Sequence, residues 1–138
     1  QILFYLYTDS SLARVQTDGA VYFIDDKVAA LLLQRNIGRT FGEMVELVGE
    51  PESIVSMITV GGDAVIAIVP AKGVVFEFYP KSDKLRTETR IDAMMFFDTS
   101  HYEELLHAGM FSLGEYDANE TRKIMYPWKG YGSIPLCL

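Results

Sequence analysis

The predicted sheet depends most on residues 74–97, which read VVFEFYPKSDKLRTETRIDAMMFF. Apolar and polar side chains alternate here, and successive side chains of a strand point to opposite faces of a sheet. We therefore expect strands at 74–79 and 86–97, joined by the turn-forming residues 80–83. One face should be buried (dry) and the other solvent-exposed (the wet face), as in a sheet packed on one side only. The wet face would carry Glu77, Tyr79, Arg86, Glu88 and Arg90.

Two more strands are expected before this stretch. Residues 54–60 and 64–69 are rich in β-branched and apolar residues, and Gly61-Gly62-Asp63 separates them. The links between the four predicted strands are short, whereas a parallel crossover needs about a dozen residues. The pattern therefore predicts a four-stranded antiparallel meander.

Two helices are expected before the sheet. Residues 25–36 begin with aspartates that could cap a helix and continue with a wide apolar face. Thr40-Phe41-Gly42-Glu43 has the capping-box spacing, in which each side chain bonds the other's backbone N–H. The second helix should run from Phe41 to Val48, because Gly49 favours a left-handed cap and Pro51 prevents continuation.

Further short helices are expected after the sheet. Ser100-His101-Tyr102-Glu103 repeats the capping-box spacing and leads to a stop at Gly109. Asp117 could cap another helix that Pro127 ends. The predicted fold is therefore α+β: a helix pair packed on a four-stranded antiparallel meander, with additional short C-terminal helices, in a single domain over residues 1–138.

The composition agrees with one folded domain. The chain has 138 residues, of which 49% are hydrophobic and 22% charged, values typical of globular proteins rather than disordered ones. Acidic residues number 19 against 12 basic ones, which gives a net charge of −7 and a pI near 4.7. An acidic protein is poorly suited to neutralise phosphates, so we expect no nucleic-acid partner.

The two ends of the given sequence contain few residues that indicate a function. An apolar run from Ile2 to Tyr7 is much shorter than the roughly 18 to 20 residues of a membrane helix. Because it follows Gln1 without a Met, it is consistent with removal of an upstream signal or membrane anchor. The simpler interpretation is a terminal strand or helix packed on the core. The single cysteine, Cys137, has no intramolecular partner and no metal-ligand spacing around it.

Five residues around the second predicted helix follow the spacing of a known family. Gly38 and Thr40 precede the helix, Met44 lies four residues after the threonine, and Gly49 and Pro51 close it. This pattern resembles the helix-loop-helix and antiparallel-sheet module of the small outer-membrane-assembly lipoproteins and the β-lactamase inhibitory proteins. The resemblance implies an extracytoplasmic or cell-envelope location and a scaffold, inhibitor or binding role, with no catalytic residue to transfer.

The densest group of titratable residues lies near the third predicted helix. It has neither the His-Glu-x-x-His spacing of zinc enzymes nor a related one, and a solvated helix explains it. The chain also lacks a nucleophile elbow, a P-loop and a dinucleotide-binding glycine pattern. We therefore assign no catalytic residue, metal ligand or cofactor. The group comprises Asp98, His101, Glu103, Glu104 and His107.

An aromatic segment near the C-terminus is the best candidate for recognition. Clustered aromatics beside glycine are common at binding surfaces, although they could also cover one end of the core. We expect a non-enzymatic module that binds a protein or another macromolecule through its sheet face and this segment. The alternative is a small enzyme or ligand-binding domain with its site between the sheet and the C-terminal helices. The candidate binding residues are Glu77, Tyr79, Arg86, Arg90, Tyr126, Trp128 and Tyr131.

Overall fold

The computed structural model describes residues 2–8, 17–34, 37–59, 62–80, 84–113 and 116–133. Cys137 and most of the predicted turn at 80–83 lie outside these residues. The helices are α1 (Phe41–Val48), α2 (Tyr102–His107) and α3 (Ala118–Lys123), with 3-10 turns η1 (Pro70–Lys72) and η2 (Thr99–His101). The strands are β1 (Ile2–Thr8), β2 (Thr17–Ile24), β3 (Lys27–Leu33), β4 (Ser53–Thr59), β5 (Gly62–Val69), β6 (Val74–Phe78), β7 (Lys84–Leu85), β8 (Ala93–Phe97), β9 (Met125–Pro127) and β10 (Gly132–Ser133).

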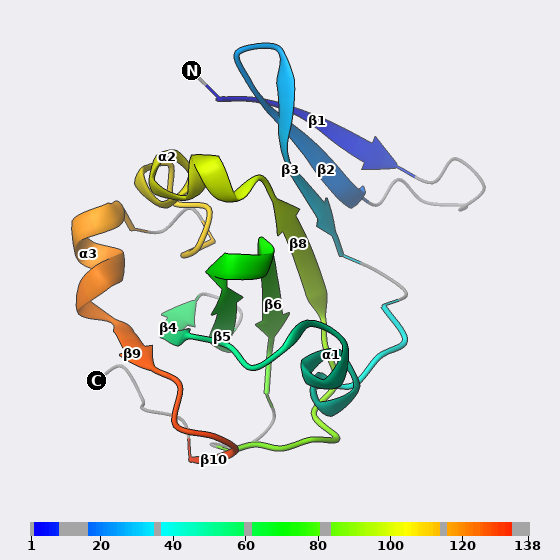
Figure 1. Ribbon diagram of the computed structural model, residues 1–138, viewed down its shortest axis with the longest axis vertical. Coiled ribbons are helices and arrows are strands. Elements are labelled where there is room, and N and C mark those ends of the chain that lie inside the picture. The colour runs from blue at the N-terminus through cyan, green and yellow to red at the C-terminus, as the bar shows by residue number, and fades with distance from the viewer. Residues whose placement is uncertain are drawn as a thin grey trace.

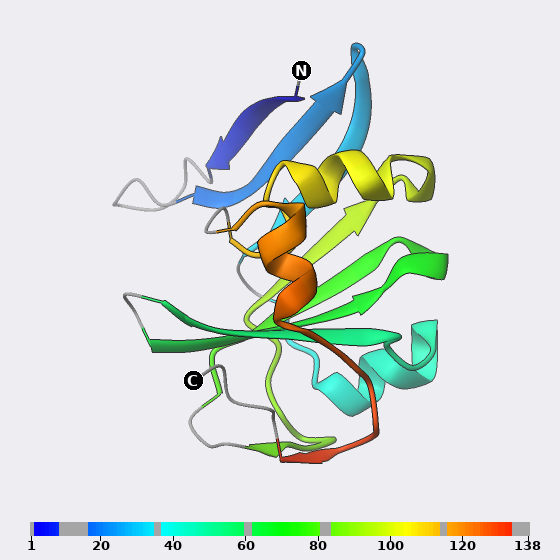
Figure 2. The same cartoon turned by 90° about the vertical axis from the view of Figure 1, so that its left-hand side faces the viewer.

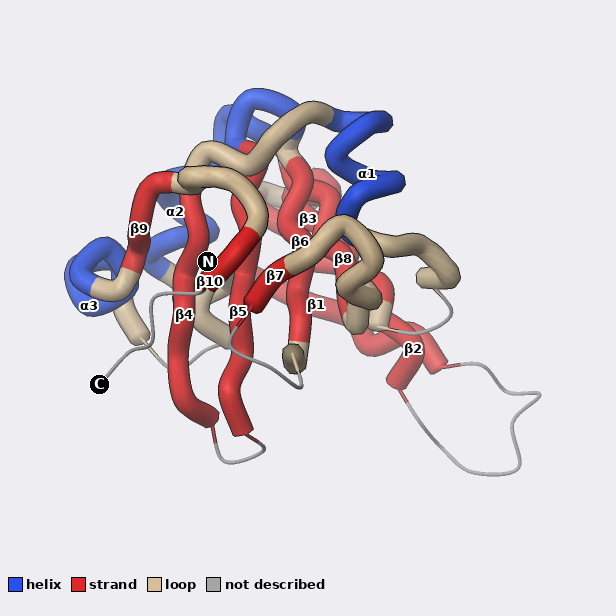
Figure 3. The backbone as a smooth tube through the Cα atoms, turned by 90° about the horizontal axis from the view of Figure 1, so that it is seen from below, coloured by secondary structure: helices blue, strands red, loops and turns tan. Residues whose placement is uncertain are grey.

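Eight of the described strands form one sheet in the order β1-β2-β3-β8-β6-β5-β4-β9 (Figure 1). Every neighbouring pair is antiparallel. A second sheet pairs β10 with β7 (Figure 3). The α+β class and the antiparallel sheet are confirmed, but the sheet is twice as wide as the predicted meander, and of the predicted helix pair 25–36 and 41–48 only the second helix forms.

The predicted helix at residues 25–36 is wrong, because this segment contains the turn and second strand of a hairpin. Asp25 and Asp26 both have positive φ, 50° and 63°, as a two-residue type I′ turn requires. Pairing with β2 on one side and β8 on the other gives β3 more hydrogen bonds than a short helix would give it. A register shift opposite Tyr22 and Phe23 turns Ala29 and Ala30 to the same buried face.

Helices cover both faces of the sheet, so the molecule has three layers (Figure 2). On one face α1 contributes Phe41 and Met44 to a core with Phe76 and Phe78 of β6. On the other face α2 contributes Leu105 and Leu106 to a core that includes Val75 and Met95. The predicted wet face is therefore wrong over the centre of the sheet, where β5 and β6 are buried on both sides.

The predicted strand at 86–97 begins late, at Ala93, because the preceding loop binds the start of α1. The first N–H groups of a helix have no partner within it. The N–H of Phe41 donates to the carbonyl of Thr89 at 2.9 Å, and that of Gly42 to the carbonyl of Thr87 at 2.8 Å. A side chain on Gly42 would place its Cβ 2.9 Å from the Thr87 Cβ. The close approach explains a glycine inside this helix.

The ends of α1 lie where the sequence predicts, although the Glu43 side chain pairs with Arg39 at 3.4 Å instead of completing the capping box. The Thr40 side chain accepts a hydrogen bond from the N–H of Glu43, and the N–H of Gly49 donates to the carbonyl of Val45. Asp117 likewise caps α3. The predicted cap at Ser100 is wrong: Asp98 accepts from both the N–H and the hydroxyl of Ser100, so the aspartate starts η2 before α2 begins.

Candidate functional site

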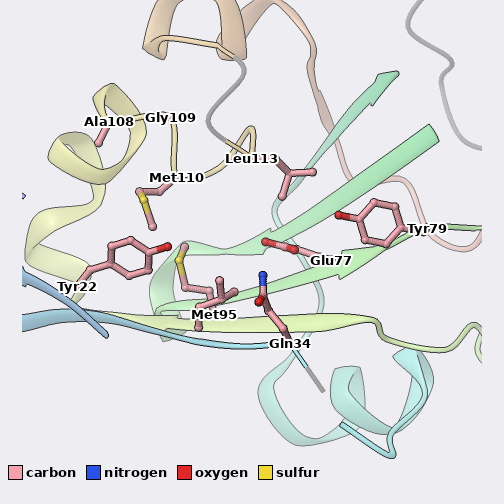
Figure 4. Close-up of a pocket in the computed structure, with 10 residues that line it drawn as sticks. Tyr22, Gln34, Glu77, Tyr79, Met95, Ala108, Gly109, Met110 and Leu113 are labelled. Atoms are coloured by element: carbon pink, nitrogen blue, oxygen red, sulfur yellow. The ribbon is translucent and has the colours of Figure 1, made fainter. Parts of the chain in front are cut away.

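A cavity of about 410 Å³ lies between the sheet and the turns that follow α2 (Figure 4). Its size is within the roughly 300 to 1,000 Å³ of small-molecule pockets. Four adjacent strands, β2, β3, β8 and β6, provide its floor, and the chain after α2 provides its roof. The lining residues are Tyr22, Leu32, Gln34, Glu77, Tyr79, Met95, Ala108, Gly109, Met110 and Leu113.

The floor follows from the register of the strands. Leu32 of β3 pairs with Met95 of β8, and Met95 pairs with Val75 of β6. Directly opposite residues share a face of an antiparallel pair, and Glu77 lies two residues beyond Val75 on the same face. The register therefore places one carboxyl group beside a row of apolar side chains.

The roof is built by the way α2 ends. Gly109 has φ of 78°, and its N–H donates to the carbonyl of Leu106 at 3.1 Å. The N–H of Met110 donates to the carbonyl of Leu105 at 3.0 Å. These two bonds make a Schellman cap, which reverses the chain and carries Met110 over the sheet.

A buried serine holds the rest of the roof. The Ser112 hydroxyl is fully buried and donates to the carbonyl of Tyr116 at 2.9 Å, and it accepts from the Tyr116 N–H at 3.2 Å. Its next neighbour, Leu113, has a left-handed φ of 54°, which costs energy for a residue with a branched side chain. Ser112 thus fixes the turn that places Leu113 in the cavity wall.

Glu77 is the chemically distinctive residue of the cavity. Only 7% of its surface is exposed. Burial raises the pKa of its carboxyl group from 4.5 to about 7, and the neighbouring carboxylate of Asp92 adds to the rise. At neutral pH the group is therefore close to half protonated, and it can donate or accept a hydrogen bond or pair with a cation.

Two tyrosines lie on either side of this carboxyl group. Figure 4 shows the hydroxyls of Tyr22 and Tyr79 directed toward Glu77, with the amide of Gln34 below it. Burial raises the pKa of both phenols, and the Glu77 charge raises each further. Both tyrosines therefore remain neutral phenols near pH 7. The site combines one titratable acid, two phenols and one amide with apolar walls.

The structure separates the candidate residues of the sheet face. Glu77 and Tyr79 meet in the cavity wall, so Glu77 does not lie on an open face as expected. Arg86 and Arg90 are exposed in the loop that caps α1, away from the central strands. Nη1 of Arg86 lies 3.9 Å from a carboxylate oxygen of Glu88. The predicted row of charged residues on one sheet face is therefore wrong.

The aromatic residues near the C-terminus pack on the opposite face of the sheet. The ring centroid of Phe41 lies 5.4 Å from that of Trp128 and 5.5 Å from that of Tyr131, with edge-to-face geometry in both pairs. Tyr126 is half-buried in β9 and pairs with Ile54. Trp128 and Tyr131 thus help to cover the core beside α1, and Tyr131 stays partly exposed.

Three members of the titratable group around α2 form ion pairs. Nδ1 of His101 lies 2.8 Å from a Glu104 oxygen, and this hydrogen bond raises the pKa of His101. Glu103 accepts a hydrogen bond from Arg122 of α3. Within the described ranges, no three His, Cys, Asp or Glu residues are grouped so that they could hold a metal ion.

Sequence reasoning missed most of the cavity. Tyr22, Gln34, Met110 and Leu113 come from segments assigned to other elements or left without a role. One signal was available: residues 64–69 and 93–97 are unbroken apolar runs, and such runs are typical of strands covered on both faces. A covered second face would have placed Glu77 under the C-terminal helices.

No family model matches the chain, and no curated protein or solved structure matches it either. Among the described helices, none is long and apolar enough to cross a membrane. Any functional inference for this chain therefore depends on its own geometry.

Proposed function

We propose that the protein binds a small amphipathic molecule in the cavity between the sheet and the turns after α2. The observation that carries this proposal is the position of Glu77, a buried carboxyl group in the wall of a cavity of about 410 Å³. Buried acids are costly unless their surroundings compensate. A ligand with a polar group at Glu77 would supply that compensation.

The walls support a ligand with a second, apolar part. Leu32, Met95, Met110 and Leu113 line the cavity around the polar residues. Methionine side chains are flexible and polarisable, so they adapt to different apolar shapes. A few directed polar groups in a mainly apolar pocket are the usual arrangement of small-molecule sites. A binding domain therefore fits this arrangement better than a flat macromolecular interface.

A fragment screen followed by amide NMR shifts tests this function. Fragments that bind should shift the amide signals of Glu77, Tyr79, Met95 and residues 108–113. Leu113→Trp should fill the cavity and abolish these shifts, because the indole occupies the ligand's space. Leu47→Trp is the matched control, since Leu47 is 69% exposed on α1. Fragments whose shifts persist in Leu113→Trp, or no binding fragment at all, would contradict the proposed function.

A second candidate function is supported by an apolar surface on the other side of the sheet. We define the open face as Val28, Leu31, Leu33 and Phe96, which are 37% to 56% exposed. Leu31 pairs directly with Phe96, so the residues are contiguous on β3 and β8. Contiguous exposed apolar residues are typical of protein-binding surfaces. We propose a protein partner at this face, in the cell envelope if the resemblance around Thr40 reflects common ancestry.

Photo-crosslinking distinguishes this second function from the first. A photoreactive amino acid at position 31 should give a discrete adduct in cells, whereas the same group at the exposed position 47 should not. Equal crosslinking from both positions would contradict a specific partner. Leu113→Trp should leave the adduct unchanged, because the cavity and the open face lie on opposite sides of the sheet.

A further inference from the structure

We propose that the ligand of the cavity is an organic amine, bound with its ammonium group against Glu77 and its apolar part against Met95, Met110 and Leu113. This inference rests on the proposed function and names the ligand class. The choice is between a cationic, a neutral and an anionic polar group, and the surroundings of Glu77 discriminate among the three.

Charge is the first argument. Of the described residues that line the cavity, Glu77 is the one acidic residue and none is Lys, Arg or His. Asp92 adds a second carboxylate close enough to act on Glu77 electrostatically. An anionic ligand would meet two like charges in a poorly solvated site, which is strongly unfavourable. A cation would neutralise them, and the net charge of −7 attracts cations toward the protein.

Hydrogen bonding is the second argument. An ammonium group has three donors and no acceptor. The polar atoms directed toward the middle of the cavity include the Glu77 carboxyl oxygens and the hydroxyls of Tyr22 and Tyr79 (Figure 4). Each of these oxygens can accept a hydrogen bond. Tyrosine rings also attract cations through their faces.

Shape is the third argument. Glu77 lies on β6 and Tyr22 on β2, while Met95 continues the floor and Met110 and Leu113 approach from the roof. A ligand whose polar end lies at Glu77 can therefore extend an apolar body between Met95 and the roof. A primary amine with a compact apolar substituent has this form, whereas a polyamine would leave a second ammonium group against methionine and leucine.

Three probes that share a phenylethyl group and differ in charge test the proposal: 2-phenylethylamine, 2-phenylethanol and 3-phenylpropanoate. Their dissociation constants are measured by calorimetry near pH 8, where Glu77 is mainly ionised and the amine is protonated. The amine should bind at least ~10-fold more tightly than the alcohol, the effect of a charge-assisted hydrogen bond. The carboxylate should bind more weakly than the alcohol.

The variants assign the preference to Glu77. Glu77→Gln should reduce the amine-to-alcohol ratio to about one while alcohol binding continues, which shows that the cavity is intact. Glu46→Gln, an exposed residue of α1, should keep the ratio of the unmodified protein. If Glu77→Gln no longer binds the alcohol, its cavity is damaged and the amine-to-alcohol ratio is measured in Asp92→Asn instead. The asparagine keeps an oxygen for the Tyr79 N–H, and the ratio should fall by roughly threefold.

Each outcome bears on a different claim. Equal binding of amine and alcohol, or tighter binding of the carboxylate, overturns the amine proposal and leaves small-molecule binding standing. An unchanged ratio in Glu77→Gln, or in Asp92→Asn where that variant decides, also overturns it. If none of the three probes binds, the amine proposal and the proposed function both fail.

Discussion

The backbone N–H of Tyr79 donates a 2.7 Å hydrogen bond to a carboxylate oxygen of Asp92. The N–H of Asp92 in turn donates to the carbonyl of Glu77 at 2.9 Å. This exchange ties the end of β6 to the residue before β8 and holds a second carboxylate near the first. Burial is the main cause of the raised pKa of Glu77, and this backbone exchange fixes the position of Asp92, which raises it further.

Folding stability should fall as the pH rises through the range in which Glu77 titrates. The folded-state pKa of about 7 lies above the ordinary value of 4.5, so between these values the folded state binds more protons than the unfolded state. The loss of folding stability caused by ionising the buried Glu77 carboxyl is absent below pH 4.5 and complete above pH 7. A difference of roughly 2.5 pKa units corresponds to about 3 kcal/mol.

Urea unfolding at pH 5 and pH 8 measures this effect. Glu77→Gln should remove most of the loss between the two pH values and should be more stable than the unmodified protein at pH 8. Glu46→Gln should retain the loss. A Glu77→Gln variant with the same pH dependence as the unmodified protein would show that Glu77 does not carry the buried charge.

Ser112→Ala should destabilise the protein by about 1 kcal/mol, because it leaves the partly buried backbone N–H and carbonyl of Tyr116 without their hydrogen-bond partner. It should also weaken fragment binding, since the turn that carries Leu113 loses its support. Ser100→Ala provides a comparison at an exposed serine. Chemical denaturation gives the first effect and calorimetry the second; unchanged values for both would contradict the role given to Ser112.

Asp26→Gly should stabilise the β2–β3 hairpin. Asp26 has φ of 63°, which costs a residue with a Cβ energy that glycine does not incur. Part of the gain is lost because glycine is freer in the unfolded chain, so we expect a net increase of about 0.5 kcal/mol in unfolding free energy. Lys27→Gly, one residue later inside β3, should be destabilising. Destabilisation by Asp26→Gly would argue against the type I′ turn.

Gly42→Ala should destabilise the protein by more than about 1 kcal/mol, even though alanine favours a helix over glycine by a similar amount. The new Cβ would lie 2.9 Å from the Thr87 Cβ and 3.0 Å from its carbonyl oxygen, so the loop before β8 must move. Leu47→Ala in the same helix should have a small effect, because Leu47 is exposed. Thermal unfolding of the two variants provides the comparison.

The sequence predicts α1 well because the information is local. Thr40, Glu43 and Gly49 specify both ends of the helix through their own backbone and side-chain bonds. The N-cap Asp117 of α3 and the left-handed Gly109 after α2 are local signals of the same kind. Two other local signals failed: Asp98 and not Ser100 starts the turn before α2, and α3 ends at Lys123, well before Pro127.

The failures occur where distant segments decide the structure. Residues 27–33 have helix-forming composition, but β2 and β8 supply hydrogen bonds that the segment itself does not reveal. Polar and apolar residues alternate over 86–92 as in a strand. The first N–H groups of α1 nevertheless donate to carbonyls of this segment, which therefore forms a loop. The position of Glu77 under α2 depends on both events. The residues of the cavity can be read in the sequence, but which of them lie next to one another depends on the order of the strands in the sheet.

The central claim is that Glu77 is a ligand-pairing acid in a poorly solvated cavity, and its own titration tests this most directly. Burial and the carboxylate of Asp92 raise the pKa of Glu77, while the pKa values of the Tyr22 and Tyr79 phenols are raised, so both stay neutral over this titration. The ¹³C shift of the Glu77 carboxyl carbon is followed against pH with and without saturating 2-phenylethylamine. We expect a midpoint near pH 7 in the free protein and a lower one with the amine, because an ammonium group favours the carboxylate. A midpoint near pH 4.5 that the amine does not move would contradict it.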